Sequence, residues 1–306
     1  MTRKKLSYAV FALVAVFALI YCFRYALHRQ TDSASHPADP ATEYLVTQYA
    51  DVSGRQGTFY TITAKDTLIV IDGGWAENAD AVRNIIKKYG GTVNAWILSH
   101  PHRDHVGAFN QIYADPDGIT IEQIYDNGFD YDFIESAGEP YDDITVMEDY
   151  YALTKDAGNV THLKRGDVFF LRGLTFSVLN AYDDIVLNNV GGEKDYQNNA
   201  SLLLRVDSAH NSMLFCSDIK YDMNDLLLSE YGDAISCDYV QTGHHGNWSF
   251  SEEFYRTTGA SVFFIDAPSE ITDSPDFPAS ALKSELLAEG KAVFTFDTAP
   301  NSVTLK

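Results

Sequence analysis

The stretch Ser99-His100-Pro101-His102-Arg103-Asp104-His105 places four side chains of metal-binding types within six residues. Imidazole and carboxylate groups hold zinc and similar divalent ions at about 2 Å. Three of the four occupy alternate positions and His105 follows directly, so a strand would turn His105 away from the others, and a helix would scatter the whole set. A loop can instead direct the first two histidines to one ion and the Asp104–His105 pair to a second. The stretch therefore predicts a metal site with two ions.

The sequence on either side of this stretch indicates where the site lies in the fold. Residues 93–98 form an apolar run that predicts a buried strand, and residues 106–109 are suited to the start of a helix. The cluster then occupies a strand-to-helix turn, the place where α/β folds keep their chemistry. The alternative is a solvated polar loop, which rarely collects three histidines and an aspartate between apolar segments.

The spacing His-x-His-x-Asp-His resembles the signature of the metallo-β-lactamase-fold hydrolases, and three further landmarks of that family follow in order. Apolar runs lead to Asp72-Gly73-Gly74, to Ser217-Asp218 and to Gly243-His244-His245-Gly246. Together the landmarks cover roughly residues 67–250, and their order makes the resemblance strong. It implies an α/β fold, an αββα four-layer sandwich, that binds two divalent ions, zinc foremost and manganese as the alternative.

The resemblance also assigns roles to individual residues. It implies that Asp218 bridges the two ions and that His245 is a ligand of the second ion, although the order of the two tandem histidines stays open. His244 is then the donor that stabilises charge on the substrate or leaving group. Asp72 is expected to orient a ligand histidine rather than to bind metal itself. The predicted metal ligands are His100, His102, Asp104, His105, Asp218 and His245, and the predicted catalytic residues are Asp104, Asp218 and His244.

One landmark departs from the family pattern. Most members supply a third histidine to the first ion, where this chain has Asn198 and Asn199 in the run Asn-Asn-x-Ser-Leu. That run resembles a subgroup that includes the hydrolase domain of competence DNA-uptake channels and the phosphorylcholine esterases of bacterial surfaces. An amide oxygen is a weaker zinc ligand than imidazole, so the first site is expected to be looser or to prefer a harder ion. Alternatively, one of the two asparagines only caps a turn.

The N-terminal region predicts a membrane-associated protein. A basic start is followed by eighteen uncharged residues from Leu6 to Phe23, just enough to span a bilayer with the basic end in the cytoplasm. A cleaved signal peptide is the alternative. We expect a signal anchor or signal peptide at 1–30, a linker at 31–41 and a hydrolase domain at 42–306. The protein would then lie in the cell membrane with its catalytic domain outside, or be secreted.

Charge and cysteine content narrow the function further. The formal net charge is −21, and because five of the 22 basic residues but only one of the 43 acidic residues lie in 1–35, the remainder carries −25. Such a field repels polyanions, so nucleic acid is an unlikely partner. Of the three cysteines, Cys216 and Cys237 end apolar runs and are expected to be buried core residues rather than a disulfide framework.

Periodicity predicts alternating strands and helices in one domain. The segment 125–151 interleaves aromatic residues with carboxylates, which suits either a cage for a cationic group or the half-buried face of a lid. Strands are expected near 44–50, 57–64, 67–71, 93–98, 120–125, 167–171, 174–180, 201–206, 212–217 and 238–242, apolar runs at 261–265 and 292–296, and helices near 77–89, 222–231, 250–257 and 279–288.

These features predict an extracytoplasmic hydrolase that cleaves a phosphoester, or more narrowly a phosphodiester, with a metal-bound hydroxide. Its partner would be a small-molecule or cell-surface phosphoester. The choice of phosphorus over acyl carbon comes from the resemblance to the subgroup. The alternatives are a lactone, thioester or amide hydrolase of the same fold, and a metal-poor binding module that has lost catalysis.

Overall fold

The computed structural model describes residues 42–137, 142–190, 195–296 and 299–306, which belong to one compact unit. The expected signal segment and linker, residues 1–41, lie outside the described residues. Within the described ranges, no helix has the length and apolar content needed to cross a membrane.

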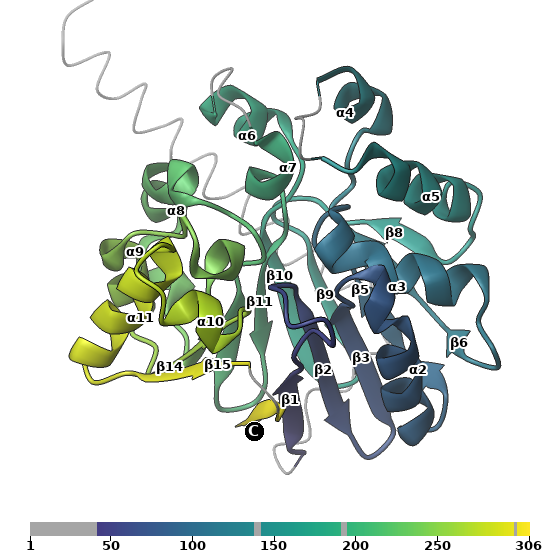
Figure 1. The fold of residues 1–306 in the computed structure, drawn as a ribbon, viewed down its shortest axis with the longest axis horizontal. Helices are drawn as coiled ribbons and strands as arrows, with labels where there is room; N and C mark the ends of the chain where they lie inside the picture. Colours follow the sequence, from purple (N-terminus) through teal and green to yellow (C-terminus); the bar gives the residue numbers. More distant parts are fainter. Residues whose placement is uncertain (1–41, 138–141, 191–194, 297–298) are drawn as a thin grey trace, which may run out of the picture. The chain divides into compact units, whose positions relative to one another are not determined.

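Two seven-stranded sheets form the centre of this unit (Figure 1). The first sheet contains, in spatial order, β16 (Asn301–Leu305), β1 (Tyr44–Gln48), β2 (Phe59–Ala64), β3 (Thr67–Asp72), β5 (Ala95–Ile97), β7 (Ile124–Asp126) and β8 (Val160–His162). The second contains β15 (Ala292–Thr295), β14 (Val262–Ile265), β13 (Tyr239–Gln241), β12 (Ser212–Phe215), β11 (Leu203–Asp207), β10 (Leu174–Asn180) and β9 (Val168–Leu171). The short strands β4 (Thr92–Val93) and β6 (Thr120–Ile121) pair separately.

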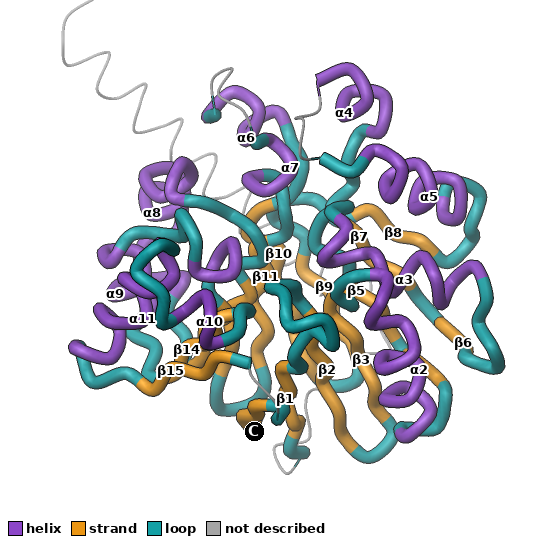
Figure 2. Tube along the Cα trace, in the orientation of Figure 1, coloured by secondary structure: helices purple, strands orange, loops and turns teal. Residues whose placement is uncertain are grey.

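Helices cover the outer faces of both sheets (Figure 2). The α-helices are α2 (Ala79–Lys88), α3 (Arg103–Ala114), α4 (Tyr131–Ala137), α5 (Ile144–Thr154), α6 (Asp184–Asn189), α7 (Tyr196–Asn199), α8 (Asn224–Tyr231), α9 (Glu252–Thr258), α10 (Ser269–Thr272) and α11 (Pro278–Ala288). Short 3₁₀ turns are η1 (Ala76–Asn78), η2 (Tyr221–Met223), η3 (Gly232–Ile235) and η4 (Gly243–Gly246).

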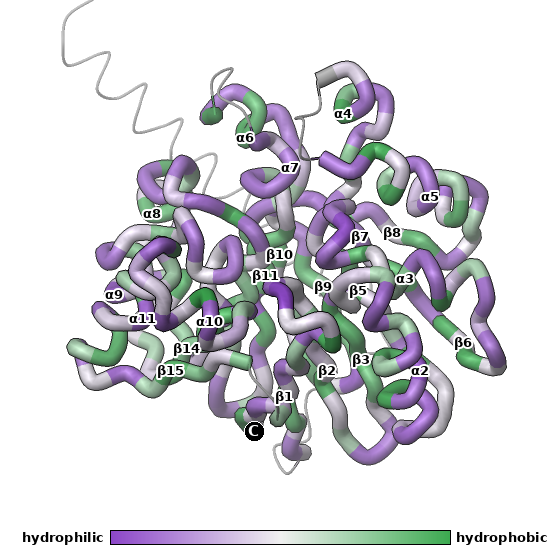
Figure 3. The backbone as a smooth tube through the Cα atoms, viewed as in Figure 1, coloured by the Kyte–Doolittle hydropathy of each residue, from purple (hydrophilic) through white to green (hydrophobic). Residues whose placement is uncertain are grey.

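Three buried apolar clusters define four layers. The central cluster joins side chains of both sheets, such as Ile62 and Phe176. A second lies between the first sheet and helices α2 and α3, and a third lies between the second sheet and helices α8, α9 and α11. Figure 3 shows hydrophobic stretches on strands such as β2 and β3, while helix α2 changes between hydrophobic and hydrophilic residues along its turns. The arrangement is helix–sheet–sheet–helix, as the sequence predicts.

The side-chain periods explain these layers. Strand β10 alternates buried and half-buried residues along its length, because successive side chains face opposite sides of a sheet. Helix α2 buries Val82 and Ile86, which are four residues apart and share one face. Strands β3 and β5 are parallel, as are β12 and β13, so the carboxyl ends of each pair lie together. Those ends carry the site described below.

Most predicted elements are present with ends shifted by a few residues, and the differences have local causes. The structure adds strand β16, which pairs with β1 along the edge of the first sheet. Its sequence Asn-Ser-Val-Thr-Leu is too short and polar to give a clear alternating signal. The aromatic-acidic segment contains helices α4 and α5, and helix α3 begins at Arg103, before the residues expected to open it.

Candidate metal centre

The predicted ligands converge from three strand ends. His100 and His102 lie in the loop after β5, and Asp104 and His105 lie in the first turn of α3. The cluster therefore spans a loop-to-helix boundary rather than a loop alone. Asp218 follows β12, and the two tandem histidines form η4 after β13. The first sheet contributes the end of β5 with helix α3, and the second contributes the ends of β12 and β13, so each sheet holds part of the cluster rigidly.

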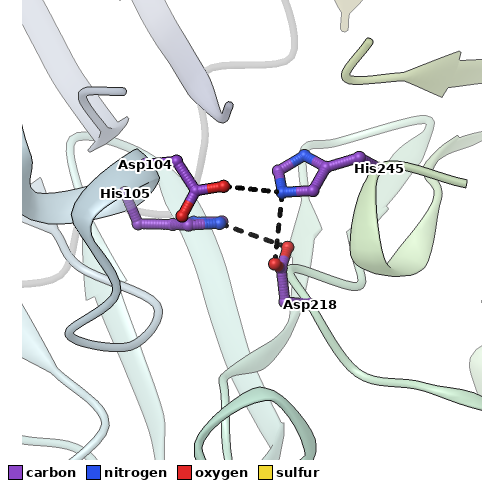
Figure 4. Close-up of side chains that lie close together, drawn as sticks. All are labelled: Asp104, His105, Asp218 and His245. Atoms are coloured by element: carbon purple, nitrogen blue, oxygen red, sulfur yellow. Dashed lines mark ion pairs between the residues drawn. The ribbon is translucent and has the colours of Figure 1, made fainter. Parts of the chain in front are cut away.

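Four side chains form the second candidate site (Figure 4). His245 Nε2 lies 3.2 Å from Asp104 Oδ2 and 3.2 Å from Asp218 Oδ2. His105 Nε2 lies 3.2 Å from Asp218 Oδ1. Four ligand atoms at about 2 Å from one zinc ion in tetrahedral geometry lie about 3.3 Å apart, so these separations suit a shared cation.

Three side chains form the first candidate site, and Asp218 belongs to both. His100 Nε2 lies 3.9 Å from Asp218 Oδ2. The rings of His100 and His102 meet edge to face with centroids 4.5 Å apart. A carboxylate has two oxygens and can contact two ions at once, which is the arrangement of two-metal hydrolytic sites.

The buried polar atoms at this position fit a cation. Among the described residues, His100 Nε2, His105 Nε2, His245 Nε2 and Asp218 Oδ1 are buried without a hydrogen-bond partner. A buried polar atom left unpaired costs about 1–3 kcal/mol, so several at one point indicate a missing partner. Nitrogen and carboxylate oxygen are donors that zinc, manganese and iron accept. The residues present therefore fit a pair of divalent ions.

Electrostatics within the cluster favour ionised carboxylates. Burial opposes the charged form of Asp218, but the neighbouring His105 and His245 outweigh it and hold the pKa of Asp218 well below its usual range. The pKa of Asp104 is lowered in the same way, with His245 as the main partner against burial. Burial would lower the pKa of His245, but Asp218 and Asp104 raise it to about 10. Burial, with its histidine neighbours, lowers the pKa of His100.

Asp72 and Ser99 orient two ligand histidines through Nδ1, the ring nitrogen that faces away from the cluster. His105 Nδ1 donates to Asp72 Oδ2 at 2.8 Å, and Ser99 Oγ donates to the same oxygen at 2.8 Å. Because the hydroxyl has one proton, Ser99 Oγ accepts from His100 Nδ1 at 3.0 Å. This pattern leaves Nε2 of both rings for the cluster. Asp72 thus has the position expected for a residue that orients a ligand; Ser99 was not predicted.

The backbone at the site is strained. Asp72, Ser217, His244 and His245 all have positive φ values, although none is glycine. Such conformations cost about 1–3 kcal/mol each and persist where the surrounding structure enforces them, often at functional sites. The left-handed turn directs His245 to the cluster, whereas His244 lines the adjacent cavity. His244 Nδ1 donates to the carbonyl of Asn247 at 2.6 Å, so in the neutral ring Nε2 is an acceptor.

The Asn-Asn-x-Ser run supports Asp218. Ser201 Oγ donates to the carbonyl of Asn198 at 2.6 Å and accepts from the backbone N–H of Asp218 at 3.2 Å. Asn199 Oδ1 accepts from the backbone N–H of Lys220, so Asn199 has a structural role. Asn198 lines the cavity, and its buried Oδ1 has no hydrogen-bond partner among the described residues. Asn198 is therefore the asparagine that could face an ion or substrate.

A cavity of about 500 Å³ opens beside the cluster. Its lining residues are Gln56, Trp75, His102, Arg103, Asp104, Asp143, Asp195, Asn198, Asp218, Lys220, Tyr221, His244 and Trp248. Lys220 Nζ lies 2.6 Å from Asp195 Oδ2 and 5.9 Å from the centre of the Trp248 ring. Lys220 and Trp248 lie outside the family landmarks, and no spacing in the sequence connects them with the cluster.

The segment 125–151 contributes one described residue, Asp143, to the cavity wall. Its aromatic rings pack elsewhere: Tyr150 is buried and donates to Asp126, and Phe129 packs on Tyr150. No aromatic residue in the described part of the segment lines this cavity, so the structure does not support an aromatic cage there, and the lid face stays a prediction. Cys216 and Cys237 are free and buried, as predicted.

Comparisons with known proteins agree with the fold. Residues 52–121 match the family model of the metallo-beta-lactamase superfamily. The metallo-beta-lactamase fold protein YhfI from Bacillus subtilis is 12% identical and superposes with a TM-score of 0.54, over 86% of this chain and 100% of that chain.

A second solved structure is CmlA, a diiron beta-hydroxylase from Streptomyces venezuelae, which is 10% identical with a TM-score of 0.53. The alignment covers 89% of this chain and 55% of CmlA, so the chain spans about half of its length. At these identities both likenesses show the fold alone. No curated protein sequence matches the chain significantly.

Proposed function

We propose that this chain, whose residues 52–121 match the metallo-beta-lactamase superfamily model, is a dinuclear metal-dependent hydrolase that cleaves a phosphodiester outside the cytoplasmic membrane. The observation that carries the proposal is the pair of candidate metal sites that share Asp218. Two-metal sites with a shared carboxylate are typical of phosphatases, nucleases and aminopeptidases. The phosphoester is assigned by the resemblance of the Asn-Asn-x-Ser-Leu and His-His-Gly runs to a phosphoesterase-containing subgroup.

Each ion would be held by its own set of residues, with Asp218 common to both. His100, His102 and Asp218 would hold the first ion, and Asp104, His105, His245 and Asp218 the second. When bound, the ions supply Lewis acidity and lower the pKa of water toward neutrality. We propose zinc as the metal, with manganese as the alternative.

Two side chains of the cavity wall, Lys220 and His244, could act on an anionic substrate that loses a leaving group. Lys220, which lines the cavity beside the cluster and pairs with Asp195, would contact a phosphate oxygen. His244 Nε2, an acceptor in the neutral ring, would first take up a proton released when the phosphoester is attacked and then pass it to the leaving oxygen, with Asn247 fixing the ring through Nδ1. The acidic domain would face a small or cell-surface phosphoester rather than nucleic acid, because its charge of −25 outside residues 1–35 repels polyanions.

The test is an assay of the full chain loaded with Zn²⁺ or Mn²⁺. The substrates are bis-p-nitrophenyl phosphate, p-nitrophenyl phosphorylcholine and a chromogenic β-lactam, and the control is Asp104→Ala. The proposal predicts metal-dependent cleavage of a phosphodiester that the variant loses. Turnover of the β-lactam alone would overturn it in favour of an acyl hydrolase. No turnover with less than one tightly bound ion per chain would identify a binding protein.

A further inference from the structure

Each candidate ligand histidine after β5 has a partner behind its ring, and one partner comes from a distant segment. His100 contacts Ser99, its neighbour in the chain, and His105 contacts Asp72 at the end of β3. His102 Nε2 lies 2.8 Å from Oδ1 of Asp142, forty residues away in sequence. The exposed fraction of the Asp142 side chain is 3%, and that of His102 is 11%. This contact joins the segment before helix α5 to the candidate metal centre.

We propose that Asp142 is a positioning residue that holds the His102 ring in the tautomer and orientation required by the first metal site. A carboxylate only accepts hydrogen bonds, so Nε2 of His102 must carry the proton that it shares with Asp142. The lone pair then lies on Nδ1, the nitrogen left for an ion. Ligand histidines commonly donate their second N–H to a carboxylate, which fixes the ring and raises its basicity.

The segment that carries Asp142 is anchored on the helix that follows His102. Asp143 lies 3.7 Å from Arg103, the first residue of α3, and its side chain accepts from Val146 N at the start of α5. Asn110 of α3 donates to the carbonyl of Val146 at 2.9 Å. Asp142 is thus held where helices α3 and α5 meet, so a displacement of α5 would be transmitted to His102.

A purely structural ion pair is the competing interpretation. In that case Asp142 would stabilise the fold through His102 and would not affect metal affinity. The two interpretations predict different metal affinities. A positioning residue affects the affinity of the first site alone, whereas a purely structural ion pair affects the affinity of neither site. The inference rests on the metal site of the proposed function, but it does not depend on the substrate.

The experiment measures Co²⁺ binding to the full chain by visible absorption, with metal content by mass spectrometry. It compares Asp142→Ala, Asp142→Asn and the matched control Asp149→Asn, which removes an equal charge from an exposed position of helix α5. Titrations are repeated in a His105→Ala background, which isolates the first site. We expect Asp142→Ala to weaken first-site binding about 10- to 100-fold and leave the second site unchanged. Asp142→Asn keeps an acceptor and should fall between Asp142→Ala and the control.

Two results would overturn the inference. One is first-site affinity unchanged in Asp142→Ala, and the other is equal weakening in Asp142→Asn and Asp149→Asn, which would indicate a general effect of charge. If Asp142→Ala does not fold, the comparison of the two asparagine variants decides. If the protein binds two ions, loses first-site affinity in Asp142→Ala and cleaves no phosphodiester, the inference is supported and the proposed substrate is rejected. If Asp142→Ala cleaves a phosphodiester and binds both ions tightly, the proposed substrate is supported and the inference is rejected.

Discussion

His105 Nδ1 lies 2.8 Å from Oδ2 of Asp72, and both side chains are completely buried. The same carboxylate accepts from the backbone N–H and the hydroxyl of Ser99. Asp72 ends strand β3 and His105 begins helix α3, so this contact fixes a candidate ligand to the end of a central strand. A fully paired buried carboxylate of this kind restricts its partners to one geometry.

Replacing Asp72 by alanine should therefore weaken metal binding at the second site about 10- to 100-fold, because His105 loses the group that orients it. The change also leaves the buried Ser99 hydroxyl and the His105 N–H without an acceptor, so the free energy of unfolding should fall by about 1–3 kcal/mol. Calorimetric zinc titration and urea unfolding measure the two effects. Asp66→Ala, at an exposed turn between β2 and β3, is the control. Unchanged zinc affinity in Asp72→Ala would show that strand β3 does not support the site.

Sequence reasoning worked for features that are local in the chain. The cluster from His100 to His105 lies within six residues, and Asp218 and His245 each follow an apolar run, so a pattern contained within each segment was enough to predict them. The structure brings these predicted residues together. Their role as ligands stays a prediction until metal binding is measured.

Features that depend on contacts between distant segments could not be predicted in this way. Asp142 meets His102 across forty residues, and Lys220 meets Asp195 across twenty-five. Nothing in the local pattern of any of these residues shows its partner. Ser201 is different, because it lies within the Asn-Asn-x-Ser run and its contact with the backbone of Asp218 could have been suggested by that motif. Strand β16 was missed because its short, polar sequence gives no clear alternation, and only its pairing with β1 marks it as a strand.

Substitutions of the two tandem histidines should have different effects on metal content and turnover. His245→Ala removes a nitrogen that lies 3.2 Å from two carboxylates, so it should lose the second ion. His244→Ala should retain both ions, because His244 lines the cavity instead. Its kcat on bis-p-nitrophenyl phosphate should fall about 10²- to 10⁴-fold if it transfers a proton. The exposed His210→Ala is the control. Loss of an ion in His244→Ala would reverse the assignment of the pair.

Metal binding should release protons at neutral pH. The pKa of His245 is raised to about 10, and the pKa of His105 is raised well above its usual value by Asp218 and Asp72 despite burial. A raised pKa keeps the ring protonated at pH 7, and an ion must displace that proton to reach the nitrogen. Affinity should therefore increase with pH, by about tenfold per unit for each proton released.

Calorimetric zinc titrations at pH 7 in buffers with different ionisation enthalpies would count the released protons. The stability of the metal-free protein depends on pH in the opposite direction: the charged pairs stabilise the fold fully only below the ordinary histidine pKa of 6.5, and this contribution is lost as the pH rises from there through about 10. A binding enthalpy that does not depend on the buffer would show that the histidines are already neutral.

Gly243 should be intolerant of substitution because it brings the histidine turn against the loop that carries Asp218. A Cβ atom at this position would lie 2.2 Å from the carbonyl oxygen of Ile219, a backbone atom that cannot rotate away. Gly243→Ala should therefore push η4 from the end of β12, separate His245 from Asp218 and lower the free energy of unfolding by about 1–3 kcal/mol.

Urea unfolding and Co²⁺ titration of Gly243→Ala test this expectation, with Gly158→Ala as the matched control. An added Cβ at Gly158 meets no atom within 4 Å, so the control should keep the stability and metal affinity of the unsubstituted chain. If Gly243→Ala lost stability but kept its second-site affinity, the turn would have moved without carrying His245 with it. The positions of the two ligands would then be set by the cluster itself, through the charges of Asp104 and Asp218, rather than by the packing of the two strand ends.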